Sequence, residues 1–317
     1  MRRFLQRLRA TAVAATCTIT WPAAAAAPPQ VSVAVSIQPQ AYFAERVGGS
    51  RVAVQVLVPP GQNHETYNVT ARQMAELSAA RLYFRVGLPF ENVLIPKLQD
   101  SLPNLKVIDT RQGIRLRRME HEHEHTHHGE GEGDHAGEEN PPVAPPGEQT
   151  PFGMDPHIWL SPRLAQVQAA TICDALSALD PAGAAVYAQN LAALRNDLDA
   201  LDRRLAEALA PVRGRAFLVY HPAFGYFADD YGLIQKPVEI EGKSPSASQL
   251  VRIITEAKAA NAKVIFVEPQ FSPRAATSVA VAIGGAVVPI DPIAKDYAAN
   301  LEAIAGKLKA ALAGQTP

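Results

Sequence analysis

Two series of short, apolar, β-branched segments constrain the fold of this chain more than any other feature. Each segment is bounded by breaker residues, which is typical of a buried strand. The segments are Val31–Ile37, Val52–Val58, Leu82–Val86 and Leu105–Ile108 in the first half, and Ala216–Tyr220, Gln235–Ile240, Lys263–Val267 and Ala286–Ile290 in the second. Helical patterns, such as the one at Thr70–Ala80, separate them. This alternation predicts an α/β fold with parallel sheets covered by helices.

One long helix is expected between the two halves. Asp180 and Pro181 supply a cap and a first-turn proline. Apolar residues then recur at steps of three to five as far as Pro211, in a single stripe at Val186, Leu191, Leu194, Leu198, Leu201, Leu205 and Leu209. A helix of about 29 residues is roughly 43 Å long, enough to cross a domain. We therefore predict an N-terminal lobe over 28–180, a bridging helix over 181–210 and a C-terminal lobe over 211–317.

The N-terminus has the parts of a secretory signal. Residues 1–27 contain four arginines and no acid, followed by a short apolar stretch and a run of alanines. The apolar stretch is too short for a membrane-spanning helix. We expect export to the periplasm with removal of residues 1–27. A lipid anchor at Cys17 is disfavoured, because Thr16 is a poor residue to precede an acylated cysteine. Cys173 is then the only mature cysteine and cannot form an internal disulfide.

Residues 119–150 interrupt the βα pattern. The segment contains nine acidic residues, no lysine or arginine, few apolar residues and several prolines. Such a composition cannot offset the entropy of ordering, so we predict a disordered surface insertion. It also contains six histidines, namely His121, His123, His125, His127, His128 and His135. Two interpretations stay open: the histidines collect metal weakly, or the segment is a dispensable solvated loop.

The charge distribution excludes one class of partner. Without the four arginines of residues 1–27, the chain carries 31 acidic residues and fewer basic ones. No stretch forms a basic surface of the size that nucleic acid requires. We expect a monomer that does not bind nucleic acid.

Three histidines outside the insertion suggest a metal site. His64 lies in the loop after an expected strand, His157 precedes a helical pattern, and His221 directly follows a strand, as does Asp291. Ligands of open parallel sheets bind outside the carboxyl ends of the strands, so these four side chains should share one crevice between the halves. Three imidazoles and one carboxylate suit tetrahedral Zn²⁺. Four protein ligands leave no position for a water nucleophile, which favours binding over hydrolysis.

Several strings resemble a known family. They are Pro59–Thr70, Asp155–Pro162, His221–Leu233 (HPAFGYFADDYGL), Glu241–Gln249 (EGKSPSASQ) and Val267–Ser272 (VEPQFS). The chain resembles the metal-receptor subunits of bacterial ABC importers, specifically the zinc-uptake periplasmic binding proteins of the TroA/ZnuA type (cluster A-I). The resemblance implies two (β/α)4 lobes joined by a rigid helix, with metal between them. It also implies delivery of the metal to an inner-membrane permease and its ATPase, and no enzymatic activity.

The first metal ligand departs from the family pattern. Family members carry a Pro-His-Thr-Tyr string, whereas this chain has Asn63-His64-Glu65-Thr66-Tyr67. Aligning the Thr-Tyr pair places Glu65 at the ligand position. We favour His64 as the ligand and keep Glu65 as its alternative. Manganese receptors of this family commonly have a glutamate in the position of His221, so His221 favours zinc.

Glu268 ends a predicted strand on the same side of the sheet. It is a candidate to orient a ligand histidine, or else a rim carboxylate bonded to backbone. A receptor for Mn²⁺ or Fe²⁺ is the alternative within the family, because such metals prefer oxygen-rich sites. A secreted zinc hydrolase with Glu268 as its base is the alternative from another class.

Overall fold

The computed structural model describes residues 31–119, 153–239 and 245–313. Each half of the chain forms one four-stranded parallel sheet, in the order β2-β1-β3-β4 and β6-β5-β7-β8. The strands are β1 (Val31–Val35), β2 (Val52–Val56), β3 (Leu82–Arg85), β4 (Lys106–Asp109), β5 (Ala216–Val219), β6 (Ile234–Pro237), β7 (Val264–Val267) and β8 (Ala286–Pro289). Both sheets have the same topology, which confirms the predicted two-lobe α/β fold. We call β1–β4 with α1–α4 the N-terminal lobe and β5–β8 with α6–α9 the C-terminal lobe.

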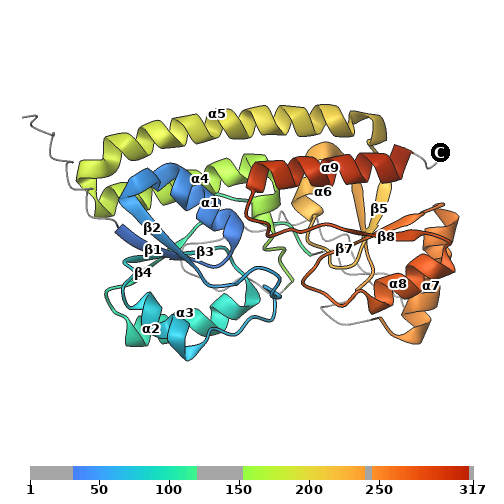
Figure 1. Cartoon of the computed structure of the whole chain (residues 1–317), viewed down its shortest axis with the longest axis horizontal. Coiled ribbons are helices and arrows are strands. Elements are labelled where there is room, and N and C mark those ends of the chain that lie inside the picture. Colours follow the sequence, from blue (N-terminus) through green and yellow to red (C-terminus); the bar gives the residue numbers. More distant parts are fainter. Residues whose placement is uncertain (1–30, 120–152, 240–244, 314–317) are drawn as a thin grey trace, which may run out of the picture.

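The helices cover both faces of each sheet (Figure 1). Helices α1, α4, α5 and α9 lie along one side of the molecule, while α2 and α3, and α7 and α8, cover the opposite faces of the two sheets. Their bounds are α1 (Gln38–Gly48), α2 (Ala71–Leu77), α3 (Pro89–Ser101), α4 (Pro162–Leu179), α5 (Ala184–Leu209), α6 (Gly225–Tyr231), α7 (Ala247–Ala259), α8 (Arg274–Ala282) and α9 (Tyr297–Ala313). Capping boxes at Thr70 and Ser246 begin α2 and α7.

Helix α5 bridges the two lobes (Figure 1). It follows a short 3-10 turn at Pro181–Gly183 and has 26 residues, which corresponds to about 39 Å. The predicted leucine stripe is buried from Leu191 to Leu209. The prediction was wrong at Val186, which is 44% exposed, because it lies off the stripe; Tyr187, four residues before Leu191, is buried instead.

The strands end earlier than the apolar segments predict. β1 ends at Val35 and β2 at Val56, although the apolar runs continue for two residues. The backbone N–H groups of Leu57 and Val58 still donate to the carbonyls of Val35 and Ser36. The chain then leaves the sheet, and Leu57 and Val58 begin the loop between β2 and α2 that carries His64 and Glu65.

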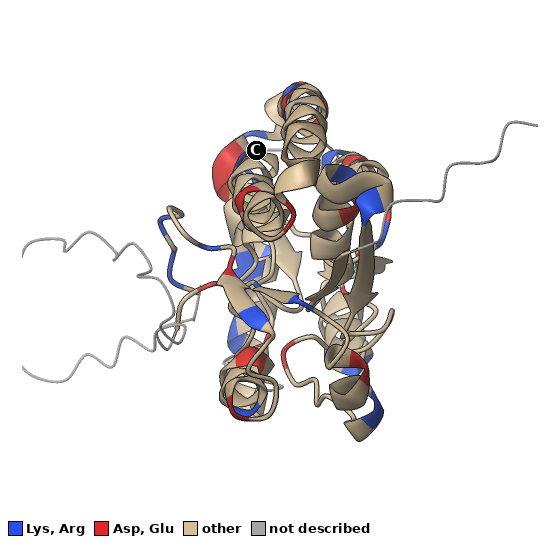
Figure 2. Ribbon diagram, turned by 90° about the vertical axis from the view of Figure 1, so that its left-hand side faces the viewer, with Lys and Arg blue, Asp and Glu red and all other residues tan. Residues whose placement is uncertain are grey.

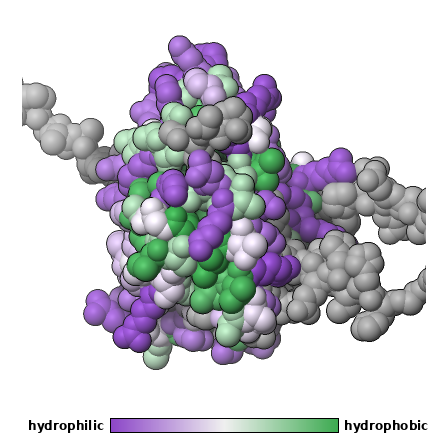
Figure 3. All heavy atoms as spheres, turned by 90° about the vertical axis from the view of Figure 1, so that its right-hand side faces the viewer, coloured by the Kyte–Doolittle hydropathy of each residue, from purple (hydrophilic) through white to green (hydrophobic). Residues whose placement is uncertain are grey.

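The apolar residues form two cores. The larger one is continuous from the N-terminal sheet through α5 and α9 to α6, and the smaller one lies between the C-terminal sheet and α7 and α8. A cavity of about 570 Å³ lies between β5, β6 and α7 and is lined mainly by apolar side chains. Apolar side chains also gather on the surface at this end of the molecule (Figure 3). None of the candidate ligands lines this cavity, so it is separate from the predicted metal site.

Several predictions fall outside the described residues. They concern the signal over residues 1–27, Cys17 and the six histidines of the insertion. Within the described ranges, no helix combines the length and apolar character needed to cross a membrane. Figure 2 shows both basic and acidic residues distributed over the ribbon.

Candidate metal centre

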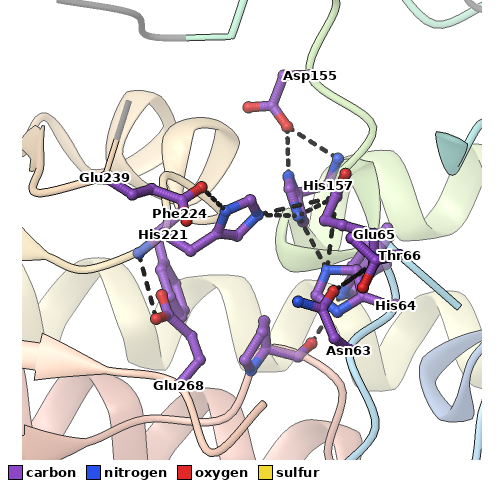
Figure 4. Close-up of polar contacts among 12 residues, drawn as sticks. Asn63, His64, Glu65, Thr66, Asp155, His157, His221, Phe224, Glu239 and Glu268 are labelled. Atoms are coloured by element: carbon purple, nitrogen blue, oxygen red, sulfur yellow. Dashed lines mark hydrogen bonds and ion pairs between the residues drawn. The ribbon is translucent and has the colours of Figure 1, made fainter. Parts of the chain in front are cut away.

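Three histidines and one glutamate converge where the two lobes meet. His64 and Glu65 lie in the loop between β2 and α2, His157 lies just before the 3-10 turn that leads into α4, and His221 lies two residues after β5. Their side chains point toward one another from both lobes (Figure 4). Among the described residues, these four form the one group of His, Cys, Asp and Glu side chains close enough to hold a metal ion.

The donor atoms are spaced as the corners of a small tetrahedron. Nε2 of His157 lies 3.2 Å from Nε2 of His64 and 3.3 Å from Nε2 of His221. Glu65 Oε1 lies 3.5 Å from Nε2 of His157 and 3.8 Å from Nε2 of both other imidazoles. A tetrahedral zinc site with bonds of 2.0–2.2 Å requires ligand-to-ligand separations of about 3.3–3.6 Å. These five pairs lie in or near that range, and all four donors lie within 4.8 Å of one another.

Glu65 Oε1 is buried and has no hydrogen-bond partner, and neither has Nδ1 of His64. A buried carboxylate oxygen without a partner is costly unless a cation binds it. This orphaned oxygen therefore supports a metal ion at the centre of the four side chains.

The pKa values divide the candidate ligands into imidazoles that are already neutral and groups that must lose a proton before a cation binds. Burial and the neighbouring imidazoles lower the pKa values of His64 and His157 well below 6.5. Burial also raises the pKa of Glu65 to about 7. For His221, burial lowers the pKa, but the hydrogen bond to Glu239 and the charges of Glu65, Glu239 and Glu268 outweigh it and raise the pKa to about 9. A bound metal must therefore displace a proton from His221.

Two buried carboxylates orient the ligand imidazoles. Asp155 Oδ1 accepts hydrogen bonds from the backbone N–H of His157 (2.9 Å) and from its Nδ1 (2.8 Å). Glu239 Oε1 accepts from Nδ1 of His221 at 2.5 Å. Each bond places the ring proton on Nδ1 and directs the Nε2 lone pair into the site (Figure 4).

Neither Asp155 nor Glu239 was among the residues predicted from the sequence. For Asp155, the sequence did offer one signal, because this acidic residue lies two positions before the predicted ligand His157. Glu239 is 18 residues from His221 and reaches it only because β6 pairs with β5. A sequence gives no direct signal for such a contact.

The structure brings Glu65, not Asp291, together with the three histidines. Asp291 Oδ1 accepts hydrogen bonds from Gln270 Nε2 (2.7 Å) and from the backbone N–H of Ile293 (3.0 Å). Asp291 does not belong to the group of candidate ligands. These bonds tie its carboxylate to the loop after β7 and to its own loop, so the prediction of Asp291 in the cluster is not met and Glu65 lies there instead.

His64 and Glu65 were predicted as alternatives, and the structure places both in the cluster. The side-chain oxygen of Asn63 accepts hydrogen bonds from the backbone N–H groups of Glu65 (2.8 Å) and Thr66 (3.3 Å). This turn frees the chain from the strand geometry, in which consecutive side chains point to opposite faces. Two adjacent residues can therefore contribute donors to one site.

Glu268 lies beside the site and is bonded to backbone, the second of its two expected roles, although it is buried and not at a rim. It is fully buried, and its Oε2 accepts a hydrogen bond from the backbone N–H of His221 at 3.3 Å. It thus supports the backbone of His221, while Glu239 orients the ring. Burial raises the pKa of Glu268 to about 8 despite the opposing charge of His221.

Aromatic side chains form walls around the site. The fully buried Trp159 has its ring centroid 5.1 Å from that of His157. The ring of Phe271 stacks on that of His221, with centroids 4.8 Å apart and planes 20° apart. Trp159 also donates from Nε1 to the carbonyl of Pro292 at 2.7 Å, which ties this wall to the C-terminal lobe. The walls reduce the access of water to the imidazoles.

The family model for "Zinc-uptake complex component A periplasmic" matches residues 33–311. The chain belongs to this ZnuA family. The high-affinity zinc uptake system protein ZnuA of Yersinia pestis is 27% identical over 273 residues, which is 83% of each chain. A second curated relative, ZnuA of Paracoccus denitrificans, is 38% identical over 125 residues, which is 38% of each chain.

Solved structures of ZnuA proteins agree with this assignment. The crystal structure of one ZnuA is 39% identical and has a TM-score of 0.77, with 89% of this chain and 99% of that chain covered. A ZnuA deletion mutant with zinc bound is 38% identical and has a TM-score of 0.78, with 90% and 100% covered.

Membership of the ZnuA family establishes the class of protein. The chain is a metal-binding receptor for ABC import, not an enzyme, so the alternative of a secreted zinc hydrolase is set aside. Receptors of the ZnuA family act outside the cytoplasm together with a permease and an ATPase, and the family binds Zn²⁺.

Proposed function

We propose that this chain captures Zn²⁺ in the periplasm and delivers it to an inner-membrane ABC permease. His64, Glu65, His157 and His221 are the proposed ligands. The observation that carries the proposal is the spacing of these four donors, which lie 3.2–3.8 Å apart in five of their six pairs and all within 4.8 Å of one another. It is supported by the orphaned, buried Oε1 of Glu65.

The donor set favours zinc over the alternative cargoes. Three imidazole nitrogens and one carboxylate oxygen are typical zinc ligands, whereas Mn²⁺ favours oxygen-rich, octahedral sites. Separations of 3.2–3.8 Å are close to those expected for four short bonds to zinc. Several relatives are named for zinc uptake or zinc binding, which agrees with zinc as the cargo.

Competition with a chromogenic chelator tests the proposal. We expect one tight Zn²⁺ site per chain and weaker binding of Mn²⁺ under the same conditions. The variants His157→Ala and His221→Ala should each lose the tight Zn²⁺ site. Their far-UV circular dichroism spectra should be unchanged, because the fold is intact. Asp291→Asn is the matched control. Tight Zn²⁺ binding that survives in both histidine variants, or preference for Mn²⁺, would refute the proposal.

We also propose that His121, His123, His125, His127, His128 and His135 bind Zn²⁺ weakly. Deletion of residues 121–140 should lower the total stoichiometry in equilibrium dialysis and keep the tight site. The zinc-bound structure of a related ZnuA deletion mutant is compatible with this expectation. Loss of the tight site on deletion would contradict it.

We propose that export removes residues 1–27 without lipidation. The mass of the purified mature protein tests this, because acylation would leave Cys17 as the first residue with its lipid attached. Size-exclusion chromatography with light scattering should show a monomer.

A further inference from the structure

Arg117 lies between the two lobes, one step away from the metal centre. Its side chain is 18% exposed and contacts two carboxylates. Nη1 lies 3.3 Å from Asp155 Oδ2 in the N-terminal lobe, and Nε lies 3.1 Å from Asp229 Oδ2 on α6 of the C-terminal lobe. Arg117 therefore links a carboxylate that orients a ligand to a helix of the opposite lobe.

The first turn of α6 is shaped around this guanidinium. A Cβ at Gly225 would lie 1.4 Å from Nη1 of Arg117 and 2.8 Å from Oδ2 of Asp155, so only glycine allows their approach. The guanidinium carbon lies 5.8 Å from the ring centroid of Tyr226. The hydroxyl of Tyr226 accepts from the backbone N–H of Arg117 and donates to the carbonyl of Asp155, both at 3.0 Å. These contacts bring α6 against the Arg117–Asp155 pair.

The two oxygens of Asp155 divide their partners. Oδ1 accepts from the backbone and ring nitrogens of His157, and Oδ2 faces Arg117. A continuous path thus runs from Asp229 through Arg117 and Asp155 to the imidazole of His157. Rotation of the Asp155 carboxylate would break the bond to Nδ1, so whatever holds Oδ2 also holds the ring.

We propose that Arg117 is a positioning residue for the metal ligand His157, and that it fixes the imidazole through Asp155 when α6 of the C-terminal lobe is in place. This inference rests on the proposed function of the site. It makes the geometry of a ligand in one lobe dependent on the docking of the other lobe. Full metal affinity then requires both lobes to be closed.

Electrostatics and positioning predict opposite results for the loss of Arg117. Its positive charge reaches the site, since it contributes, after burial and His221, to the low pKa of His157. Removal of a nearby cation should by charge alone strengthen Zn²⁺ binding. Loss of positioning should weaken it, by about 10-fold, as for other residues that orient metal ligands through hydrogen bonds. The sign of the change therefore separates the two effects.

The experiment compares Arg117→Gln with Arg118→Gln in the full chain. Arg118 is exposed and pairs with Met154 through its backbone, so it gives the same change of charge without touching Asp155. Zn²⁺ affinity is measured by chelator competition, and the visible spectrum of bound Co²⁺ reports ligand geometry. We expect Arg117→Gln to bind Zn²⁺ about 10-fold more weakly with an altered Co²⁺ spectrum. Arg118→Gln should match wild type, and Arg117→Lys should recover part of the affinity.

Equal or tighter Zn²⁺ binding by Arg117→Gln, with an unchanged Co²⁺ spectrum, would overturn the inference and leave the proposed function standing. If Arg117→Gln does not fold, Asp229→Asn tests the inference instead. Asp229 is exposed and pairs with Arg117 from the other lobe, so its exchange should not prevent folding. A wild-type Co²⁺ spectrum and affinity in that variant would overturn the coupling between lobes, and a weaker affinity would support it. A wild-type chain without a tight zinc site would overturn both proposals.

Discussion

The identity of the carboxylate ligand is the sharpest question that the structure poses. Glu65 lies among the three histidines with a buried, unpartnered oxygen, whereas Asp291 is bonded to Gln270 and Ile293 outside the cluster. Exchange of Glu65→Gln keeps the shape of the side chain and removes its charge. Asp291→Asn is the same change at the competing position. The two variants form a matched pair.

The loss of Zn²⁺ affinity expected for Glu65→Gln can be estimated from the number of ligands. A four-ligand structural zinc site binds with about 10–16 kcal/mol, so each ligand contributes on average about 2.5–4 kcal/mol. This is a factor of about 10²–10³ in affinity. The neutral amide oxygen of glutamine is still a weak ligand. The loss of Zn²⁺ affinity in Glu65→Gln should therefore be near the lower end of this range, at about 10²-fold. Asp291→Asn should remain within about twofold, the scatter expected where no ligand is lost.

Chelator competition at pH 7.5 measures both affinities, and a second series at lower pH adds an independent check. Because burial raises the pKa of Glu65 to about 7, a proton competes with Zn²⁺ for this carboxylate as the pH falls. Glutamine has no such proton, so the difference between wild type and Glu65→Gln should narrow below pH 7. A large loss in Asp291→Asn with wild-type affinity in Glu65→Gln would refute the reasoning.

Three further predictions concern the groups around the ligands. Glu239→Gln should weaken Zn²⁺ binding by about 10–100-fold in the same competition assay, because it removes the carboxylate that holds the ring of His221; an unchanged affinity would contradict that role. Since the pKa of His221 is about 9 without metal, Zn²⁺ binding at pH 8 should release about one proton, and affinity should fall by about tenfold per pH unit below that. Calorimetry in buffers of different ionisation enthalpy measures this release, and a value near zero would show that His221 is neutral. Gly225→Ala should lower the midpoint of thermal unfolding, because its methyl group would overlap the guanidinium of Arg117; an unchanged midpoint would show that Arg117 moves aside freely.

Much of the fold follows from local sequence patterns. Buried parallel strands read as short apolar runs, and the leucine stripe of α5 repeats at helical spacing, so both were visible without coordinates. The predicted ends were less reliable. Val186 is apolar but exposed, because burial depends on what packs against a residue. Leu57 and Val58 are buried as expected, but they lie beyond the end of β2.

The candidate site was only partly visible in the sequence. His64, His157 and His221 stand out because they are isolated from the other histidines and lie beside expected strands, and all three reach the cluster. Their chemistry alone indicates a metal that prefers nitrogen ligands. The sequence by itself therefore determined the fold class and pointed to the three imidazoles that cluster in the structure.

The tertiary structure alone decided which carboxylates accompany them. Asp291 and Glu65 are both acidic residues in loops near strand ends, and no local pattern distinguishes them. The choice depends on the turn at Asn63, which aims Glu65 inward, and on Gln270, which holds Asp291 away. Pairing of β5 with β6 likewise brings Glu239 to His221. Side-chain direction in loops is set by contacts between distant residues, so it exists only once the two lobes have packed together.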